Sequence, residues 1–239
     1  MPGTQGYAVV SCHVERPFDD EVWRRYSELL RRRPSGFQIA SLMRAPAYGE
    51  DAGLFAERAR EAVELGPFGH HTHWTSPTHA RPTSGNPAER VLAEGLKLRA
   101  QGLEPRFFCG GGWYMDAELM GVVAELGYVD CTATGWRPQY LRAGAPRASL
   151  DQPAWVRLND GRRVLELPTT HSLGAASRRL ARPLPRVVHV HFHDFELLDP
   201  KRRLALGAIL AVLARRRQAT ELGALQAERE VAWADVWAG

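Results

Sequence analysis

The apolar positions of this chain fall into seven short runs, and segments with helical periodicity separate most of them. The runs span residues 7–11, 37–43, 67–74, 105–110, 129–134, 164–170 and 187–193. Each run has the length of a typical β-strand. Strands that alternate with helices indicate βαβ units, which build a parallel sheet. The pattern therefore predicts an α/β fold.

Capping residues and stop signals predict the helices between the runs. Asp19 or Asp20 precedes the first helix, and Asn86–Pro87 places proline at the first helical position of a later one. The predicted helices cover residues 21–32, 53–65, 87–101, 117–126 and 201–217, and an amphipathic segment over about 220–233 ends the chain. The Pro- and Gly-rich stretch at about 137–160 has no helical period, so it is either a long loop or a short β insertion.

All nine histidines lie at or just past the ends of the apolar runs. Those of the first, third, sixth and seventh runs would meet if the sheet closes into a barrel, because barrel active sites form where the strands end. Neutral imidazole is the commonest metal ligand in proteins. No break in composition marks a domain boundary. We therefore expect residues 1–239 to form a single catalytic barrel domain that holds a metal, with an open doubly wound sheet as the alternative.

Composition excludes several classes of function. The formal net charge of +4 and the pI of about 9.2 come almost entirely from arginines on predicted helix faces. No nucleic-acid-binding motif accompanies them, so we expect no nucleic-acid partner. Three cysteines without CxxC spacing indicate a reduced chain. The N-terminus does not resemble a signal peptide, and the longest apolar helical stretch, 204–213, is too short to span a bilayer. We expect a cytoplasmic protein without a membrane partner, and its oligomeric state stays open.

The third run and its continuation carry four histidines, His70, His71, His73 and His79. In an extended strand, His71 and His73 point to one face and His70 to the other. Two imidazoles on the same face can bind one Zn²⁺. His79 lies on a loop that could bring it back as a third ligand.

The ends of the first and last runs supply a carboxylate and further imidazoles. Glu15 and His13 share a face, and Glu15 would complete a His₂-carboxylate zinc site that leaves one position for water. In the last run, His189, His191 and His193 alternate onto one face. The deeper two could be internal hydrogen-bonding residues. His193, at the strand end, is the better candidate for a general acid.

The fourth run ends in three consecutive glycines, Gly110 to Gly112, followed by Trp113 and Tyr114. Glycines let the backbone approach a ligand closely, and their N–H groups could form an oxyanion hole. A tight turn before the next helix would use the same glycines.

Together these segments resemble the polysaccharide deacetylases, the NodB-like superfamily of carbohydrate esterases of the family 4 type. The resemblance extends from about Tyr7 to Arg217. Residues 69–73 resemble its second motif, 110–114 with 126–128 its third, and 190–194 its last. The resemblance implies a distorted (β/α)₇ barrel, a divalent metal, and hydrolysis of an acetyl group on a sugar. In such enzymes an aspartate is the base, and a histidine protonates the leaving amine.

The chain departs from the family pattern at three places. His13 and Glu15 stand where the first motif normally has two aspartates, so the base would be an imidazole or the roles are redistributed. The family's second metal histidine usually lies four residues after the first, where this chain has Thr75. His73 or His79 must therefore substitute. In the third motif, Arg106 is displaced by one residue.

We therefore expect a metal-dependent hydrolase that removes an acetyl group, N-acetyl rather than O-acetyl, from a small sugar or glycoside. Zn²⁺ is the expected metal, with Co²⁺ or Ni²⁺ as alternatives. The expected metal ligands are Glu15, His71, His73 and His79. His13 would be the base or an extra ligand, and His193 the acid, oriented by Asp194 or another carboxylate. The backbone at Gly110 and Gly111 would bind the oxyanion, and the candidate sugar-stacking residues are Trp74, Trp113, Tyr114 and Trp136.

Two other functions fit the same sequence. Pairs of the form His-x-His also occur in other barrel hydrolases, such as amidohydrolases and PHP-type phosphoesterases. These enzymes hold two metals about 3.5–4 Å apart. A relative that has lost its base with the aspartates could instead bind a sugar without catalysis.

Overall fold

The computed structural model describes residues 6–74, 80–138 and 141–238 of the chain. Each of the seven predicted runs overlaps one strand. The strands are β1 (Tyr7–Val14), β2 (Ala40–Arg44), β3 (Phe68–Thr72), β4 (Phe107–Gly110), β5 (Val129–Asp130), β8 (Arg163–Glu166) and β10 (Val187–His193). They belong to one sheet with the order β12-β7-β8-β5-β4-β3-β2-β1-β10-β9. Neighbouring strands from β5 through β9 along this order are parallel, as the βαβ pattern predicts.

The sheet closes into a barrel through the extended segment from β8 to β9 (His171–Ser172). On one side, the Leu167 and Thr169 N–H groups donate to the carbonyls of Asp130 and Ala133, after β5. On the other side, β9 pairs with β10, and the Thr170 N–H donates to the His189 carbonyl. One interrupted strand therefore joins the two edges, giving the distorted (β/α)₇ barrel expected from the sequence.

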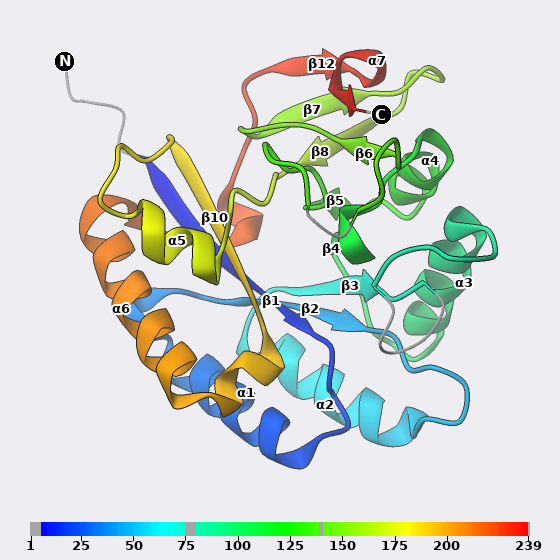
Figure 1. Cartoon of the computed structure of the whole chain (residues 1–239). Helices are drawn as coiled ribbons and strands as arrows, with labels where there is room; N and C mark the ends of the chain where they lie inside the picture. The colour runs from blue at the N-terminus through cyan, green and yellow to red at the C-terminus, as the bar shows by residue number, and fades with distance from the viewer. Residues whose placement is uncertain (1–5, 75–79, 139–140, 239) are drawn as a thin grey trace.

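Helices cover the outside of the strands (Figure 1). They are α1 (Asp20–Arg32), α2 (Ala52–Leu65), α3 (Pro87–Ala100), α4 (Ala117–Glu125), α5 (Leu173–Arg179) and α6 (Pro200–Arg216). Each begins at a residue whose side chain accepts a hydrogen bond from an N–H of the first turn: Asp19, Asp51, Asn86, Asp116, Ser172 and Asp199. All five predicted helices are present. The short α5 was not predicted.

The stretch predicted as a loop or β insertion contains β6 (Arg147–Ala148) and β7 (Ala154–Arg157), and β7 pairs antiparallel with β8. The C-terminal segment adds to it. This segment holds β11 (Gln218–Ala219), β12 (Glu230–Ala232), α7 (Trp233–Val236) and β13 (Trp237–Ala238). Leu222 and Leu225 pack with the barrel interior, whereas Trp233 and Val236 pack against the insertion. The apolar residues of this segment therefore pack against two different parts of the molecule. They do not form the face of one continuous helix.

Two carboxyl groups face each other in the wall of the barrel. Asp130 on β5 and Glu166 on β8 are register partners, and both are fully buried. Asp130 Oδ1 accepts hydrogen bonds from the N–H and hydroxyl of Thr132, and Glu166 Oε1 accepts one from the N–H of Ala133. The remaining oxygens, Asp130 Oδ2 and Glu166 Oε2, are enclosed and have no hydrogen-bond partner among the described residues. Two negative charges enclosed on facing residues would repel each other, and burial raises the pKa of both carboxyl groups, so we expect the pair to share a proton.

This shared proton predicts a pH-dependent stability. A carboxyl group whose pKa is raised by folding stabilises the protein at low pH, and that contribution is lost as pH rises above the unfolded pKa. We expect this pair to make the free energy of unfolding fall between pH 5 and 6, just above the pKa of an unfolded carboxyl group, by up to about 1.4 kcal/mol per pH unit for one proton. In Glu166→Gln, the amide can donate to Asp130 and still accept from Ala133, so this fall should disappear. Urea denaturation of both proteins at the two pH values measures it, and equal pH dependence would contradict the shared proton.

Candidate active site

The C-terminal ends of β1, β3 and β10 bring one carboxylate and three imidazoles together. Glu15 Oε1 lies 3.2 Å from His73 Nε2, 3.9 Å from His71 Nε2 and 3.5 Å from His193 Nε2. The parallel register of β1 with β10 sets His13 beside His193, which places Glu15 just beyond the strand end. Three of the four residues predicted as metal ligands therefore meet. His79, the fourth, lies outside the described residues.

His71, on β3, is held in the form that a metal requires. The Nδ1 of His71 donates to the carbonyl of Cys109 at 2.8 Å, so its Nε2 carries the free lone pair. This Nε2 is buried and has no hydrogen-bond partner within the described part of the chain. Burial and the nearby His73 lower the pKa of His71 to about 3, so the ring is neutral near pH 7.

Glu15 supplies the negative charge of the cluster. Burial alone would raise its pKa, but the hydrogen bond from His73 and the charge of His193 lower it to about 2. The carboxyl group is therefore ionised over the whole range in which the protein would function. Arg44, at the end of β2, holds the loop in place, since its Nε donates to the Glu15 carbonyl while its guanidinium pairs with Glu50.

The distances fit a small divalent cation. One ligand atom from each of Glu15, His71 and His73 lies within 4.8 Å of the other two. Ligand atoms about 2.1 Å from a tetrahedral ion lie roughly 3.4 Å apart. The measured separations of 3.2 and 3.9 Å from Glu15 bracket that value. An ionised carboxylate, a neutral imidazole with a free nitrogen and a second imidazole form the donor set of a catalytic zinc site.

A second group of potential ligands lies deeper and shares His71. It consists of His13, His71 and Cys109, all buried. The ring of His13 stacks on His71 at 4.4 Å and on His191 at 5.2 Å. Burial and the neighbouring imidazoles hold the pKa of His13 well below its ordinary value. Burial and the Asp130 charge raise the pKa of the Cys109 thiol, so this group lacks the ready anion that Glu15 supplies.

His193 contacts Glu196, so the carboxylate beside it is the second alternative of the sequence prediction and not Asp194. Its Nδ1 lies 3.6 Å from Glu196 Oε2, and Arg202 pairs with the other oxygen of Glu196. Burial lowers the pKa of His193, but Glu196 and Glu15 outweigh it and raise the pKa above its usual value. Asp194 has another task, because its carboxylate accepts hydrogen bonds from the N–H groups of Arg16 and Phe195. It therefore fixes the loop that carries Glu15 and does not orient His193.

The two deeper histidines of β10 differ from each other. His189 bonds to the hydroxyl of Ser11 and lies 3.3 Å from the carbonyl of Leu167, as an internal hydrogen-bonding residue would. His191 packs edge-on against Trp113 at 4.8 Å and near His13. Its Nδ1 is enclosed and has no hydrogen-bond partner among the described residues.

The Gly110 N–H is not free to form the predicted oxyanion hole. The Gly110 N–H already donates to the Thr132 hydroxyl at 2.8 Å. A Cβ on Gly111 would lie 2.3 Å from two carbonyl oxygens, those of Thr72 and Ala80. Carbonyl oxygens at that place would repel an oxyanion. The glycines are needed because the backbone packs closely here. This agrees with the alternative interpretation of the run as a tight turn.

The four aromatic residues proposed for sugar stacking have different surroundings. Trp74 is buried, and its indole N–H donates to the Gly111 carbonyl. Tyr114 is half-buried, and its hydroxyl donates to Asp116. Trp113 is also buried, and its φ of 58° is a costly conformation for a bulky residue. Half-buried Trp136 lies edge-on to Trp113 at 6.2 Å. Only Trp136 and Tyr114 keep an accessible ring surface, so we retain the stacking proposal for Trp136.

Sequence reasoning missed Glu196 and Arg44. The spacing of three residues between His193 and Glu196 was a usable signal, because η3 (Asp194–Leu198) is a single turn that returns the carboxylate to the strand end. The role of Arg44 could not be predicted from the neighbouring sequence, because its contact with Glu15 joins the ends of two separate strands.

Comparison with solved structures finds proteins of similar fold, at low sequence identity. No protein-family model and no curated protein sequence matches the chain. A 4-alpha-glucanotransferase from Thermococcus litoralis is 10% identical with a TM-score of 0.57, covering 95% of this chain. The chain spans only 42% of that enzyme's length.

Two further structures match over nearly their whole length. A family 4 carbohydrate esterase from Streptomyces lividans, in complex with acetate, is 15% identical with a TM-score of 0.50, covering 88% of each chain. A Bordetella bronchiseptica protein, described as a polysaccharide deacetylase involved in O-antigen biosynthesis, is 12% identical with a TM-score of 0.50. That match covers 90% of this chain and 86% of the other. The chain therefore has the distorted-barrel fold of the polysaccharide deacetylases.

Proposed function

We propose that this protein is a metal-dependent hydrolase that removes an N-acetyl group from a saccharide. The observation that carries the proposal is the Glu15, His71 and His73 cluster, with His193 3.5 Å from Glu15, at the C-terminal end of the barrel. The likeness in fold to a carbohydrate esterase supports it. A divalent ion bound by these three residues would supply polarisation of the acetyl carbonyl and a lowered pKa for the attacking water.

The remaining groups have distinct tasks. His193, with Glu196 behind its Nδ1, donates a proton to the leaving nitrogen. An amine leaves far more readily when protonated, so an acid in this position favours an N-acetyl over an O-acetyl substrate. His13 stacks on His71 beside the ligands, and on this geometry it is the candidate proton acceptor, although burial and the neighbouring imidazoles lower its pKa and make it a weak base. Trp136 contacts the sugar at the rim.

Acetate release tests this function. Metal-free protein is loaded in turn with Zn²⁺, Co²⁺ and Ni²⁺ and incubated with N-acetylated and O-acetylated sugars. We expect acetate together with a free amine from the N-acetylated sugar. Binding of metal without acetate from either substrate would overturn the proposal and favour the non-catalytic alternative.

A further inference from the structure

A cavity of about 410 Å³ lies between α5 and the insertion, beyond the histidine cluster. Its lining includes Trp136, Thr170, His171, Arg179 and Arg182, which we call the arginine subsite. Trp136 connects the two places, because its ring contacts Trp113 and the ring of Trp113 packs on His191. The cavity and the histidine cluster are therefore joined by a row of packed aromatic rings.

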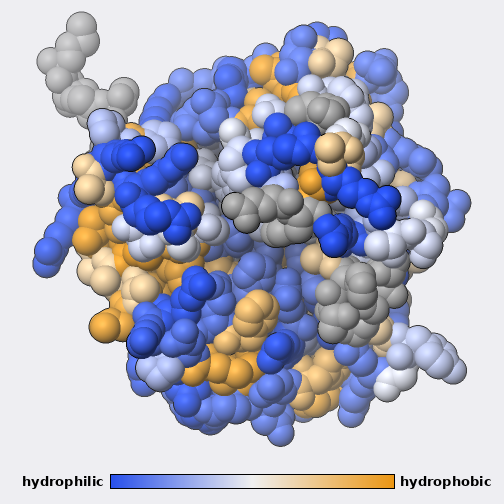
Figure 2. Space-filling view, in the orientation of Figure 1, coloured by the Kyte–Doolittle hydropathy of each residue, from blue (hydrophilic) through white to orange (hydrophobic). Residues whose placement is uncertain are grey.

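The arginines of the subsite have no carboxylate partner in the part of the chain that the structure describes. Arg179 and Arg182 are exposed, and no ion pair involves either of them. The acid that lines the cavity, Asp151, is 3.7 Å from Arg229 instead. Figure 2 shows hydrophilic residues over α5 and over the insertion. Two unpaired guanidinium groups beside one cavity favour an anion, and their planar donors suit phosphate or carboxylate oxygens.

The floor of the subsite offers a complementary polar atom. The Thr170 hydroxyl donates to the His189 carbonyl and accepts from the His189 N–H. Its other lone pair is therefore the acceptor for Nδ1–H of His171, at 2.8 Å. The Nε2 of neutral His171 is then an acceptor, which suits a sugar hydroxyl. Together with the half-buried indole of Trp136, this set matches a sugar ring that carries a negative group.

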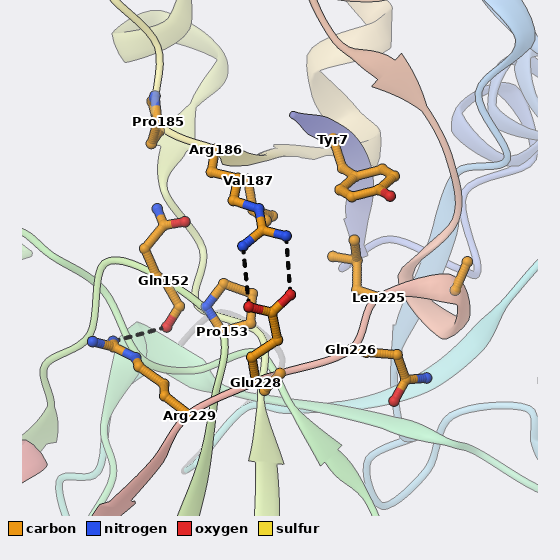
Figure 3. Close-up of a pocket in the computed structure, with 12 residues that line it drawn as sticks. Tyr7, Gln152, Pro153, Pro185, Arg186, Val187, Leu225, Gln226, Glu228 and Arg229 are labelled. Atoms are coloured by element: carbon orange, nitrogen blue, oxygen red, sulfur yellow. Dashed lines mark hydrogen bonds and ion pairs between the residues drawn. The ribbon is translucent and has the colours of Figure 1, made fainter. Parts of the chain in front are cut away.

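A larger cavity elsewhere on the barrel is a useful comparison, because its arginines have partners. It has a volume of about 670 Å³ and lies at the N-terminal ends of β1 and β10, away from the histidines. Figure 3 shows that Arg186 there is paired with Glu228, and that Arg229 donates to the Gln152 carbonyl. Its arginines are neutralised or bonded to backbone, so this cavity carries no comparable preference for an anion.

We propose that the arginine subsite binds a phosphate or carboxylate group of the saccharide substrate, with the guanidinium groups of Arg179 and Arg182 as its ligands. The substrate is then an anionic sugar, such as a sugar phosphate or a sugar acid. The claim that the substrate itself occupies the arginine subsite rests on the proposed deacetylase function. The claim that the subsite binds an anionic sugar is independent of that function.

Calorimetric titration of the full chain tests the subsite apart from catalysis. The background is His71→Ala, which should not turn over. The probes are N-acetylglucosamine 1-phosphate, N-acetylmuramic acid and uncharged N-acetylglucosamine. We expect at least one charged probe to bind about tenfold or more tightly than the uncharged one, because hydrogen bonds to charged groups have about that effect. Comparison of the first two probes distinguishes phosphate from carboxylate.

Arg179→Ala and Arg182→Ala should each weaken binding of the preferred charged probe about tenfold and leave the uncharged probe unchanged. Arg178→Ala is the matched control. It removes the same charge, from the helix that carries Arg179, at an exposed residue that does not line the cavity. Equal binding of all three probes, including no binding of any, overturns the proposal, as does an equal loss in Arg178→Ala. Charged-probe binding that depends on Arg179 in a protein that never releases acetate would sustain the subsite and refute the deacetylase.

Discussion

Replacing His71 by alanine should abolish both metal binding and acetate release. His71 belongs to both groups of potential ligands, so neither can assemble without it. Its Nε2 is buried beside Glu15 and His73, and the bond from Nδ1 to the Cys109 carbonyl aims it at them. The loss of one of three protein ligands removes most of the affinity of such a site. Metal content after dialysis and acetate release measure the two effects.

His70→Ala is the matched control for this variant. His70 is the preceding residue of β3, but it points to the other face, where it bonds to Glu94. We expect this variant to lose stability and to keep its metal. Retention of a full equivalent of metal by His71→Ala would contradict the assignment, and so would an equal loss of metal in both variants. Thermal unfolding of each protein separates loss of metal from loss of fold.

Replacing His193 by alanine should leave metal binding intact and lower kcat by about 10²–10⁴-fold. His193 is the most exposed imidazole of the cluster, and its Nε2 lies 3.5 Å from the carboxylate that would hold the metal. It is therefore placed to reach the leaving group. Steady-state kinetics with an N-acetylated sugar, alongside metal analysis, measures the effect. KM should change little, because the proton transfer belongs to the transition state.

Glu196→Gln tests the support of His193. The amide keeps the shape but removes the charge that pairs with Nδ1 and with Arg202. We expect a smaller fall in kcat than in His193→Ala. Asp194→Asn is the comparison, because its carboxylate holds the Glu15 loop through Arg16. Asp194→Asn should weaken metal affinity, with a smaller effect on kcat at saturating metal.

For the general acid itself, a wild-type kcat in His193→Ala would contradict the assignment.

The strands and helices could be predicted from the sequence because the patterns that define them are local. Apolar runs of strand length and side-chain caps such as Asn86 and Asp199 fix each element without reference to the rest of the chain. The C-terminal segment was harder. Its apolar residues Leu222 and Trp233 contact different parts of the barrel, and a single sequence period cannot show that.

The sequence also predicted the main residues of the candidate site, but not their detailed roles. Side-chain alternation placed His71 and His73 on one face, and the barrel topology brings Glu15 to them. The finer roles depend on contacts between separate strands. Only the structure shows that the Gly110 N–H is bonded to Thr132 and so is not free for an oxyanion, or that Arg44 supports Glu15.

A crystal structure of the Zn²⁺-loaded protein, with anomalous scattering to locate the metal, tests the central claim most directly. We predict one ion per chain, bound by Glu15, His71 and His73, with its open position facing His193. A protein that binds no zinc would contradict this account. Two ions per chain, or one ion held by Cys109 and His13 in place of Glu15, would contradict it as well.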